Sequence, residues 1–280
     1  MTGALKLGLY GLHRGGTSDP EGLAKRARMA EEVGFESLWV GDHIALPSDM
    51  DGEQPRLEAV VAVTYLAAVT TRIRLAFGVL VLPQRQPVLL AKQVASIDNL
   101  SRGRLILGIG VGYVEPELRA LGVPLGERAA RTDEYLAAMR TLWREEPPTF
   151  DGRFVGFADV WQRPRPVQLP HPPIVISGHS PAAHRRAVRT GRGWYGWRLD
   201  VEQAAEALAE LREAAKHTER PDELGQLEIT ITPPGPVDLD TARRYADIGV
   251  HRLTLEPASA DGPAVDELIA RVGDTLIGRV

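Results

Sequence analysis

The pattern of apolar and polar residues is most regular between residues 72 and 113. Residues 75–82 form an unbroken apolar run, which is typical of a strand buried on both faces of a parallel sheet. Pro87 suits the first position of a helix. Apolar residues then recur at helical spacing, at Leu90, Val94, Ile97 and Leu100. With a second buried strand at residues 105–109, this stretch predicts a strand–helix–strand unit of a parallel sheet.

The same alternation of apolar strands and amphipathic helices continues along the chain. Strands are expected at residues 5–10, 35–40, 75–82, 105–109, 174–177, 194–197, 227–232 and 252–255. Helices are expected around residues 23–33, 57–69, 87–100, 135–142, 201–215, 239–248 and 265–276, and after residue 181. Eight strands alternating with helices, without a linker, predict a single (β/α)8 barrel domain over residues 1–280. An open doubly wound sheet, which usually has fewer strands, is the alternative.

One long connection interrupts this alternation before the fifth strand. Residues 145–173 contain seven prolines and scattered aromatic residues. A connection of this length is uncommon in a compact domain and is usually functional. We interpret it as an excursion over the mouth of the barrel, with a hairpin around Asp151-Gly152. A structural strap along the side of the barrel is an equally good interpretation.

Composition narrows the classes of function. The net charge is −4 and the pI is near 6.0, which does not favour a surface for nucleic acid or for a membrane. The chain contains no cysteine, so disulfides, thiolate catalysis and thiolate metal sites are excluded. No apolar run approaches the ~20 residues of a membrane span, and no signal pattern opens the chain. We therefore expect a cytoplasmic protein that acts on a small molecule.

In a barrel, the side chains that follow the strands meet at one mouth. The candidates there are His13, Arg14, Asp42, His43, Gln84, Arg85, Tyr113, Glu115, His179, Ser180 and Arg198. Asp42-His43 is the best acid–base candidate, because histidine titrates near neutral pH and a carboxylate can bind its ring N–H. Taken alone, however, the pair is better explained by an ordinary polar strand end, or by an N-cap aspartate beside a hydrogen-bonded histidine.

Glycines mark three further places within or just after the expected strands. Gly78 lies inside an expected strand, where a glycine often indicates a bulge or the close approach of a ligand. Gly110 and Gly112 follow the next strand at the end where parallel sheets bind ligands. The turn from Gly178 to Ser180 precedes Pro181, so Ser180 can cap a helix whose free N–H groups suit a phosphate. A plain capped helix explains that turn equally well.

Other motifs are absent. The glycines at 108, 110 and 112 lack the spacing of a dinucleotide-binding fingerprint. His179 and His184 are five residues apart, which places them off one helical face, and we predict no metal site. Neither a nucleophile-elbow motif nor a P-loop motif occurs, so we propose neither a serine hydrolase nor a P-loop enzyme.

Several stretches occur in the order found in one family. They are residues 37–43, 75–87, 101–113, 151–154, 163–168 and the turn at Gly178. Together they resemble the bacterial luciferase-like flavin-dependent oxidoreductases. The resemblance implies a barrel that binds FMN or the deazaflavin F420 in its mouth. It also implies a homodimer formed through exposed parts of the second to fourth helices.

The same resemblance assigns roles to individual residues. It implies a non-proline cis peptide bulge at Gly78-Val79 that backs the cofactor ring. It implies a phosphate site formed by Gly178, His179 and Ser180, with Gly112 and Tyr113 beside it. It places Asp42 and His43 near the reactive ring carbon. Because the Asp42-His43 pair and the short chain look like the deazaflavin branch, F420 is favoured over FMN.

The expected activity is hydride transfer between F420 and a C=C, C=N, C=O or alcohol group. His43 would donate or accept the proton, and Asp42 would orient it or contact the ring. The alternative is an FMN-dependent monooxygenase that uses O2 and reduced FMN from a separate reductase. A non-catalytic barrel is a third possibility. Substrate contacts are expected from residues 46–55 and 145–173.

Overall fold

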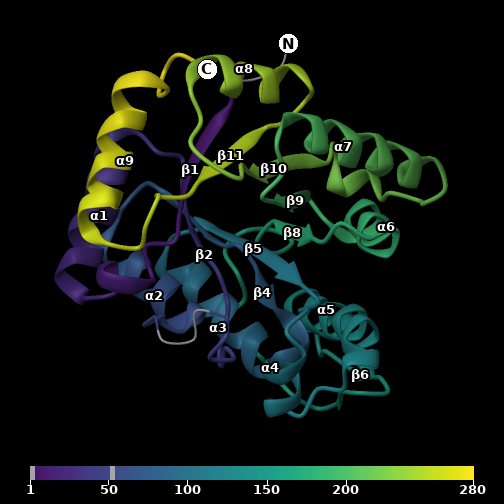
Figure 1. Cartoon of the computed structure of the whole chain (residues 1–280). Coiled ribbons are helices and arrows are strands. Elements are labelled where there is room, and N and C mark those ends of the chain that lie inside the picture. Colours follow the sequence, from purple (N-terminus) through teal and green to yellow (C-terminus); the bar gives the residue numbers. More distant parts are fainter. Residues whose placement is uncertain (1–3, 51–53) are drawn as a thin grey trace.

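Parallel strands form a closed barrel at the centre of the molecule, and helices surround it (Figure 1). The computed structural model describes residues 4–50 and 54–280. The barrel strands are β1 (Lys6–Tyr10), β2 (Ser37–Val40), β3 (Arg74–Phe77), β4 (Leu80–Val81), β5 (Leu105–Gly110), β8 (Ile174–Ser177), β9 (Gly193–Trp197), β10 (Glu228–Thr232) and β11 (Arg252–Leu255). All pairings between them are parallel, and the contacts of β1 with β11 and of β3 with β5 close the ring. The predicted (β/α)8 barrel is confirmed.

The helices cover the outside of this barrel. They are α1 (Pro20–Val33), α2 (Ala59–Val69), α3 (Pro87–Leu100), α4 (Glu115–Ala120), α5 (Arg128–Arg144), α6 (Pro181–Thr190), α7 (Val201–Lys216), α8 (Leu239–Asp247) and α9 (Gly262–Thr275). Short 3-10 turns are η1 (Gly15–Thr17), η2 (Leu82–Gln84), η3 (Leu125–Glu127) and η4 (Asp222–Leu224). Within residues 4–50 and 54–280, no helix has both the length and the apolar character needed to cross a membrane. The sequence did not predict α4.

Helix α3 shows how the local sequence sets an element. The Gln86 side chain accepts a hydrogen bond from Leu89 N (2.7 Å) and Pro87 is the first helical residue, so both features fix the start. The buried stripe ends at Ile97, because Leu100 is 69% exposed. Each helical residue turns about 100°, so Leu100 lies about 80° round the helix from Leu90 and leaves the core. The prediction that Leu100 belongs to the stripe is wrong.

The third barrel strand is interrupted, as the lone glycine within it indicated. A cis peptide bond joins Gly78 to Val79, between β3 and β4. The alternate glycines of β5 make room for this bulge. A Cβ atom on Gly108 would overlap the carbonyl oxygen of Phe77, and one on Gly110 would lie 2.8 Å from a Val79 methyl carbon. The glycine-rich end of β5 is therefore explained first by packing against the bulge.

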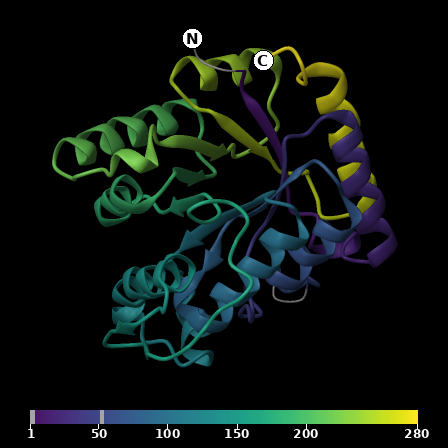
Figure 2. The same cartoon turned by 180° about the vertical axis from the view of Figure 1, so that it is seen from behind.

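The insertion before the fifth strand lies on the side of the barrel. The predicted hairpin forms from β6 (Phe150–Asp151) and β7 (Gly156–Phe157), which pair in antiparallel fashion. Beyond it, Gln162 donates to Val88 O (3.0 Å) and Arg165 O accepts from Asn99 (2.7 Å). The teal trace in Figure 2 accordingly runs over the outer surface near α3. The interpretation as an excursion over the mouth is wrong, and the strap interpretation is confirmed.

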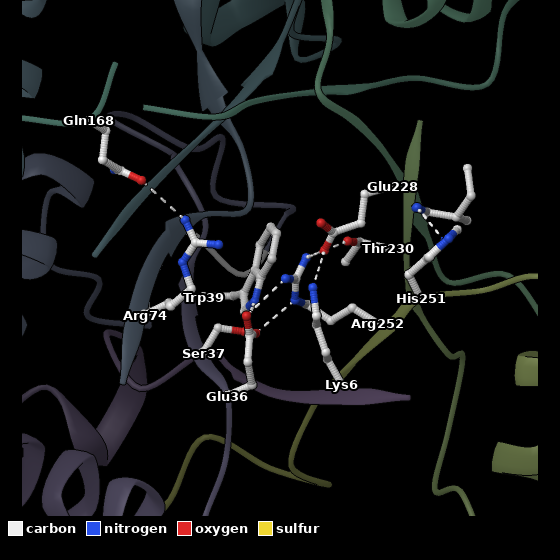
Figure 3. A network of polar contacts seen from close by, with 11 residues as sticks. Lys6, Glu36, Ser37, Trp39, Arg74, Gln168, Glu228, Thr230, His251 and Arg252 are labelled. Atoms are coloured by element: carbon white, nitrogen blue, oxygen red, sulfur yellow. Dashed lines mark hydrogen bonds and ion pairs between the residues drawn. The ribbon is translucent and has the colours of Figure 1, made fainter. Parts of the chain in front are cut away.

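Charged residues close the barrel at the N-terminal ends of its strands. Arg252 is 1% exposed and donates two hydrogen bonds to Glu36 (2.8 and 2.9 Å) (Figure 3). Its guanidinium also pairs with Glu228 (2.6 Å), which accepts from Lys6, and lies 5.7 Å from the Trp39 ring centroid. Each charge in this bottom network therefore has a partner of opposite sign.

The homodimer that the resemblance implied stays a prediction. Large apolar side chains on the expected helices are exposed, namely Val61 on α2 (61%) and Leu89 (58%) and Leu100 (69%) on α3. Their positions are consistent with that expectation without testing it.

Candidate active site

A cavity of about 660 Å³ opens at the C-terminal ends of the barrel strands. The predicted residues that line it are Arg14, Asp42, His43, Gly78, Val79, Gly110, Gly112, Tyr113, Gly178, His179 and Arg198. The predicted residues that lie outside its lining are His13, Gln84, Arg85, Glu115 and Ser180. Its volume is within the range of about 300–1,000 Å³ that is usual for small-molecule sites.

Asp42 does not pair with His43. Its buried carboxylate accepts hydrogen bonds from Val81 N (3.0 Å) and from two nitrogens of Arg85 (3.1 and 2.5 Å). Burial raises the pKa of Asp42, although Arg85 and the Val81 N–H oppose that rise. Successive residues at a strand end point to opposite sides, so sequence neighbours diverge. Asp42 thus binds the segment that follows the bulge, through Val81 and Arg85. This geometry does not support the prediction that Asp42 orients His43.

The partner of His43 is Glu117 on α4. His43 Nδ1 lies 3.1 Å from Glu117 Oε2, and the other carboxylate oxygen accepts from the N–H groups of Ile44 (2.5 Å) and Ala45 (3.1 Å). Burial alone would raise the pKa of Glu117, but these hydrogen bonds bring it below its ordinary value. A histidine held by an ionised carboxylate at a cavity wall is suited to proton transfer.

Sequence reasoning missed Glu117 and selected Glu115 instead. Both lie in the first turn of α4, and the sequence gives no adjacency between either of them and His43. Two helical positions differ by about 200° in direction, so one of the pair faces inward and the other outward. Glu117 has a 1% exposed side chain, whereas that of Glu115 is 57% exposed. The buried Leu118 was the available signal for the inward face.

The turn before α6 forms another wall. Gly178 has φ +126°, and a Cβ atom there would lie 2.7 Å from the Ala183 side chain, so the turn requires glycine. The Ser180 hydroxyl accepts from Ala183 N (3.2 Å) and caps the helix outside the cavity lining. His179 lines the cavity, and its Nε2 accepts from Trp197 N (3.3 Å). Gly178 and His179 are thus the parts of the predicted phosphate turn that border the cavity.

Aromatic side chains that the sequence analysis did not single out also line the cavity, namely Tyr10, Tyr195 and Trp197, which we call its aromatic floor. Tyr10 packs on Trp197 with ring centroids 4.9 Å apart, and Tyr195 stacks on Trp39 at 5.4 Å. Burial raises the pKa of Tyr10 to about 12, so its phenol is neutral at physiological pH. The alternation of aromatic residues and glycine at the end of β9 was the signal that could have identified part of this floor.

The rim of the cavity is charged. Glu256, at the end of β11, accepts from Arg14 (2.7 Å) and from Arg198 (2.9 Å). Arg56 lines the same rim. His13 is buried next to these cations, and burial first, then Arg14 and Arg56, lower its pKa to about 3.

The loop that follows His43 borders the cavity, as the sequence analysis expected. Leu46, Asp49 and Met50 line the cavity. Residues 51–53 of that loop lie outside the described residues. The other expected source of substrate contacts, residues 145–173, is described in full and contributes no residue to the lining.

Comparison with known proteins identifies the family. The family model described as luciferase-like monooxygenase matches residues 7–256. The chain belongs to this family. The sequence resemblance is thereby confirmed, and the chain is an oxidoreductase of the luciferase-like family.

Relatives of this luciferase-like protein use different cofactors. It is 35% identical over 272 residues to the F420-dependent glucose-6-phosphate dehydrogenase of Kineococcus radiotolerans, across 92% of this chain and 76% of that protein. It is 33% identical over 174 residues to the FMNH2-dependent dimethylsulfone monooxygenase of Pseudomonas putida, across 61% of this chain and 47% of that protein. Both cofactors therefore occur among its relatives.

A solved structure supports the barrel independently. The F420-dependent secondary alcohol dehydrogenase in complex with an F420-acetone adduct superposes with a TM-score of 0.80, covering 98% of each chain. At 17% sequence identity, this likeness concerns the fold alone.

Proposed function

We propose that this luciferase-like protein is an F420-dependent oxidoreductase that exchanges hydride with a small organic substrate. The observation that carries the proposal is the His43–Glu117 pair at the wall of the cavity. Hydride transfer at a carbon that bears oxygen needs a partner for the oxygen-bound proton, and histidine is the commonest side chain in that role.

The residues of the cavity fit a deazaflavin. The backbone at Gly78 and Val79 forms one wall, where the ring of the cofactor would rest. Gly110, Gly112 and Tyr113 would border it beyond the end of β5. Gly178 and His179, before the N-terminus of α6, would face its phosphate, because helix N-termini suit anions. Ser180 would act through its cap and not by contact.

Bound F420 supplies a ring carbon that accepts or donates hydride. In alcohol oxidation, the substrate carbon loses its C–H bond with both electrons, and His43 takes the hydroxyl proton as the C=O bond forms. Glu117 stabilises the imidazolium that results. In the reverse direction, the same imidazolium returns the proton to the oxygen of a carbonyl substrate. The aromatic floor, with Tyr10 and Trp197, excludes water from one side of the site.

Two observations favour F420 over FMN. A carboxylate-held histidine at the cavity serves a hydride and proton exchange directly. The F420-dependent relative is also similar over 92% of the chain, against 61% for the FMNH2-dependent relative. That second relative nevertheless favours one alternative, an FMN-dependent monooxygenase that receives reduced FMN from a separate reductase.

Equilibrium binding of the purified full chain to F420 and to FMN, measured side by side, tests the cofactor. We expect F420 to bind at least about tenfold more tightly, a difference of about 1.4 kcal/mol. The reverse order would contradict the proposal and favour oxygen chemistry. Oxygen consumption with supplied reduced FMN would then be the next measurement.

Replacing His43 tests the chemistry separately. We expect His43→Ala to bind F420 as well as the native chain, because the turn at Gly178 is untouched. Turnover with F420 and a substrate from an alcohol and carbonyl screen should fall about 10²–10⁴-fold, the usual contribution of a general acid or base. Unchanged turnover in this variant would remove His43 from the mechanism without altering the cofactor assignment.

A further inference from the structure

Glu117 makes more contacts than a simple ion pair needs. One oxygen, Oε1, accepts from two backbone N–H groups, those of Ile44 (2.5 Å) and Ala45 (3.1 Å). The other oxygen, Oε2, faces only His43 Nδ1, at 3.1 Å. The lowered pKa of the carboxyl keeps it ionised at neutral pH, so both oxygens are acceptors.

This arrangement allows the neutral His43 ring only one tautomer. A neutral imidazole has one N–H donor and one acceptor nitrogen. Because an ionised carboxylate cannot donate, the nitrogen that faces it must carry the hydrogen. We infer that Glu117 is a positioning residue that holds His43 in its Nδ1–H tautomer and so presents Nε2 to the cavity as a proton acceptor.

The constraint is rigid because the donors around Glu117 cannot turn away. The N–H groups of Ile44 and Ala45 are fixed by the backbone, and the Glu117 side chain is only 1% exposed, so water does not compete for its oxygens. The ring of Tyr113 meets His43 edge-on, with ring centroids 6.3 Å apart. Within the described part of the chain, His43 Nε2 has no hydrogen-bond partner, and His43 lines the cavity.

The inference deepens the proposed function and rests on it for its chemical meaning. An Nε2 lone pair directed into the cavity accepts a proton from a substrate that carries an O–H group. The neutral resting site is therefore arranged for alcohols, with hydride leaving from the carbon that bears the hydroxyl. Glu117 itself touches neither substrate nor cofactor and acts only through His43 and the start of the 44–50 loop.

The tautomer can be measured on the full chain without cofactor. Nitrogen-15 correlation spectra of the histidine rings, recorded in alkaline buffer, distinguish a protonated ring nitrogen from an unprotonated one. The chain has seven histidines, and the signal that disappears in His43→Ala identifies the residue. We expect a protonated Nδ1 and an unprotonated Nε2. The opposite pattern for the His43 ring in the native chain would overturn the inference.

Glu117→Gln sharpens the test because it exchanges one acceptor for a donor. The amide oxygen must stay with the N–H groups of Ile44 and Ala45, so the amide NH2 turns to His43. Nδ1 then has to accept, and we expect the tautomer to switch to Nε2–H. A folded Glu117→Gln chain that keeps the native tautomer would contradict the positioning role.

The matched control is Glu115→Gln on the same helix, whose side chain is 57% exposed and pairs only with Arg119. It should leave the His43 spectrum unchanged. These spectra do not involve a cofactor, so a finding that the protein binds FMN would leave the tautomer result standing. A wrong tautomer would likewise leave the F420 binding result standing.

Discussion

The two ends of the barrel bury charged and polar groups in opposite ways. At the bottom, Arg252 lies between Glu36 and Glu228 (Figure 3). Each of its three guanidinium nitrogens has a hydrogen-bond or ion-pair partner. At the mouth, His13 is equally buried, but the described residues give its Nδ1 no partner, and its charged neighbours are cations. The barrel interior that separates these two ends is built from the same strands.

This difference indicates that the bottom network serves stability and that the mouth serves function. Buried polar groups are normally hydrogen-bonded, so unpartnered ones beside a cavity are available to a ligand. The bottom network holds the strands together and offers no free group to a ligand. Among the described residues, Nε of Arg14 and Nε of Arg56 at the mouth are donors without a partner, next to the cavity. We therefore expect substitutions at the bottom to change folding, and substitutions at the mouth to change binding or proton chemistry.

The largest expected effect comes from breaking the bottom network. Arg252→Met keeps most of the side-chain volume but removes the buried cation that pairs with the partly buried carboxylates of Glu36 and Glu228. We expect the free energy of unfolding to fall by about 3–5 kcal/mol, the usual effect of removing one partner of a buried ion pair. Urea denaturation measures it.

Lys6→Met is the matched control for that substitution. Lys6 also pairs with Glu228, but its side chain is 42% exposed. Exposed ion pairs contribute about 0–1 kcal/mol, so the loss should be small. A similar loss in both variants would show that burial does not set the importance of the network, and F420 affinity should be unchanged in either.

A second effect, smaller over any single pH unit, should appear at the mouth as pH falls. The pKa of His13 is about 3 in the folded protein and near 6.5 in the unfolded chain, because burial and nearby arginines disfavour its charged form. Between these values, only the unfolded chain binds the proton. The stability that neutral His13 preserves above pH 6.5 is therefore lost by about 1.4 kcal/mol per pH unit as pH decreases toward 3.

His13→Gln removes this contribution. We expect its unfolding free energy, followed by denaturation at a series of pH values, to decline less steeply than that of the native chain. Some slope should remain, because burial also lowers the pKa of His171, to about 4. An unchanged slope in His13→Gln would mean that His13 is protonated or exposed in the folded protein, contrary to the contrast between the two ends.

The sequence predicted the barrel because the strands are short apolar or alternating runs, and most of the helices between them show their own periodicity. It also located the cavity, since residues such as His43 and His179 follow strands directly. It could not predict which of those side chains contact one another. Asp42 and His43 are adjacent in sequence but diverge in space, whereas Glu117 reaches His43 from 74 positions away. Partners of that kind depend on how a short helix sits against a loop, which periodicity does not encode.

The smallest expected effect is on cofactor binding, and it distinguishes a glycine that borders the site from one that only allows a turn. Gly178 and Gly249 both have positive φ, +126° and +101°, so alanine strains the backbone at either position. Only Gly178 borders the cavity, and its added Cβ would press on Ala183 in the first turn of α6. At Gly249 nothing lies within 4 Å of the added atom.

Backbone strain should cost Gly178→Ala and Gly249→Ala about 1–3 kcal/mol of stability each, with the larger loss at Gly178 because of its contact with Ala183, and the two variants should differ in binding. We expect F420 affinity to fall about tenfold in Gly178→Ala, or about 1.4 kcal/mol, because the turn that would face the phosphate is displaced. Gly249→Ala should bind as the native chain does. Calorimetric titration of both folded variants measures this. Equal F420 affinity in the two would mean that the turn before α6 belongs with the structural parts of the barrel, and that the phosphate is held elsewhere around the mouth.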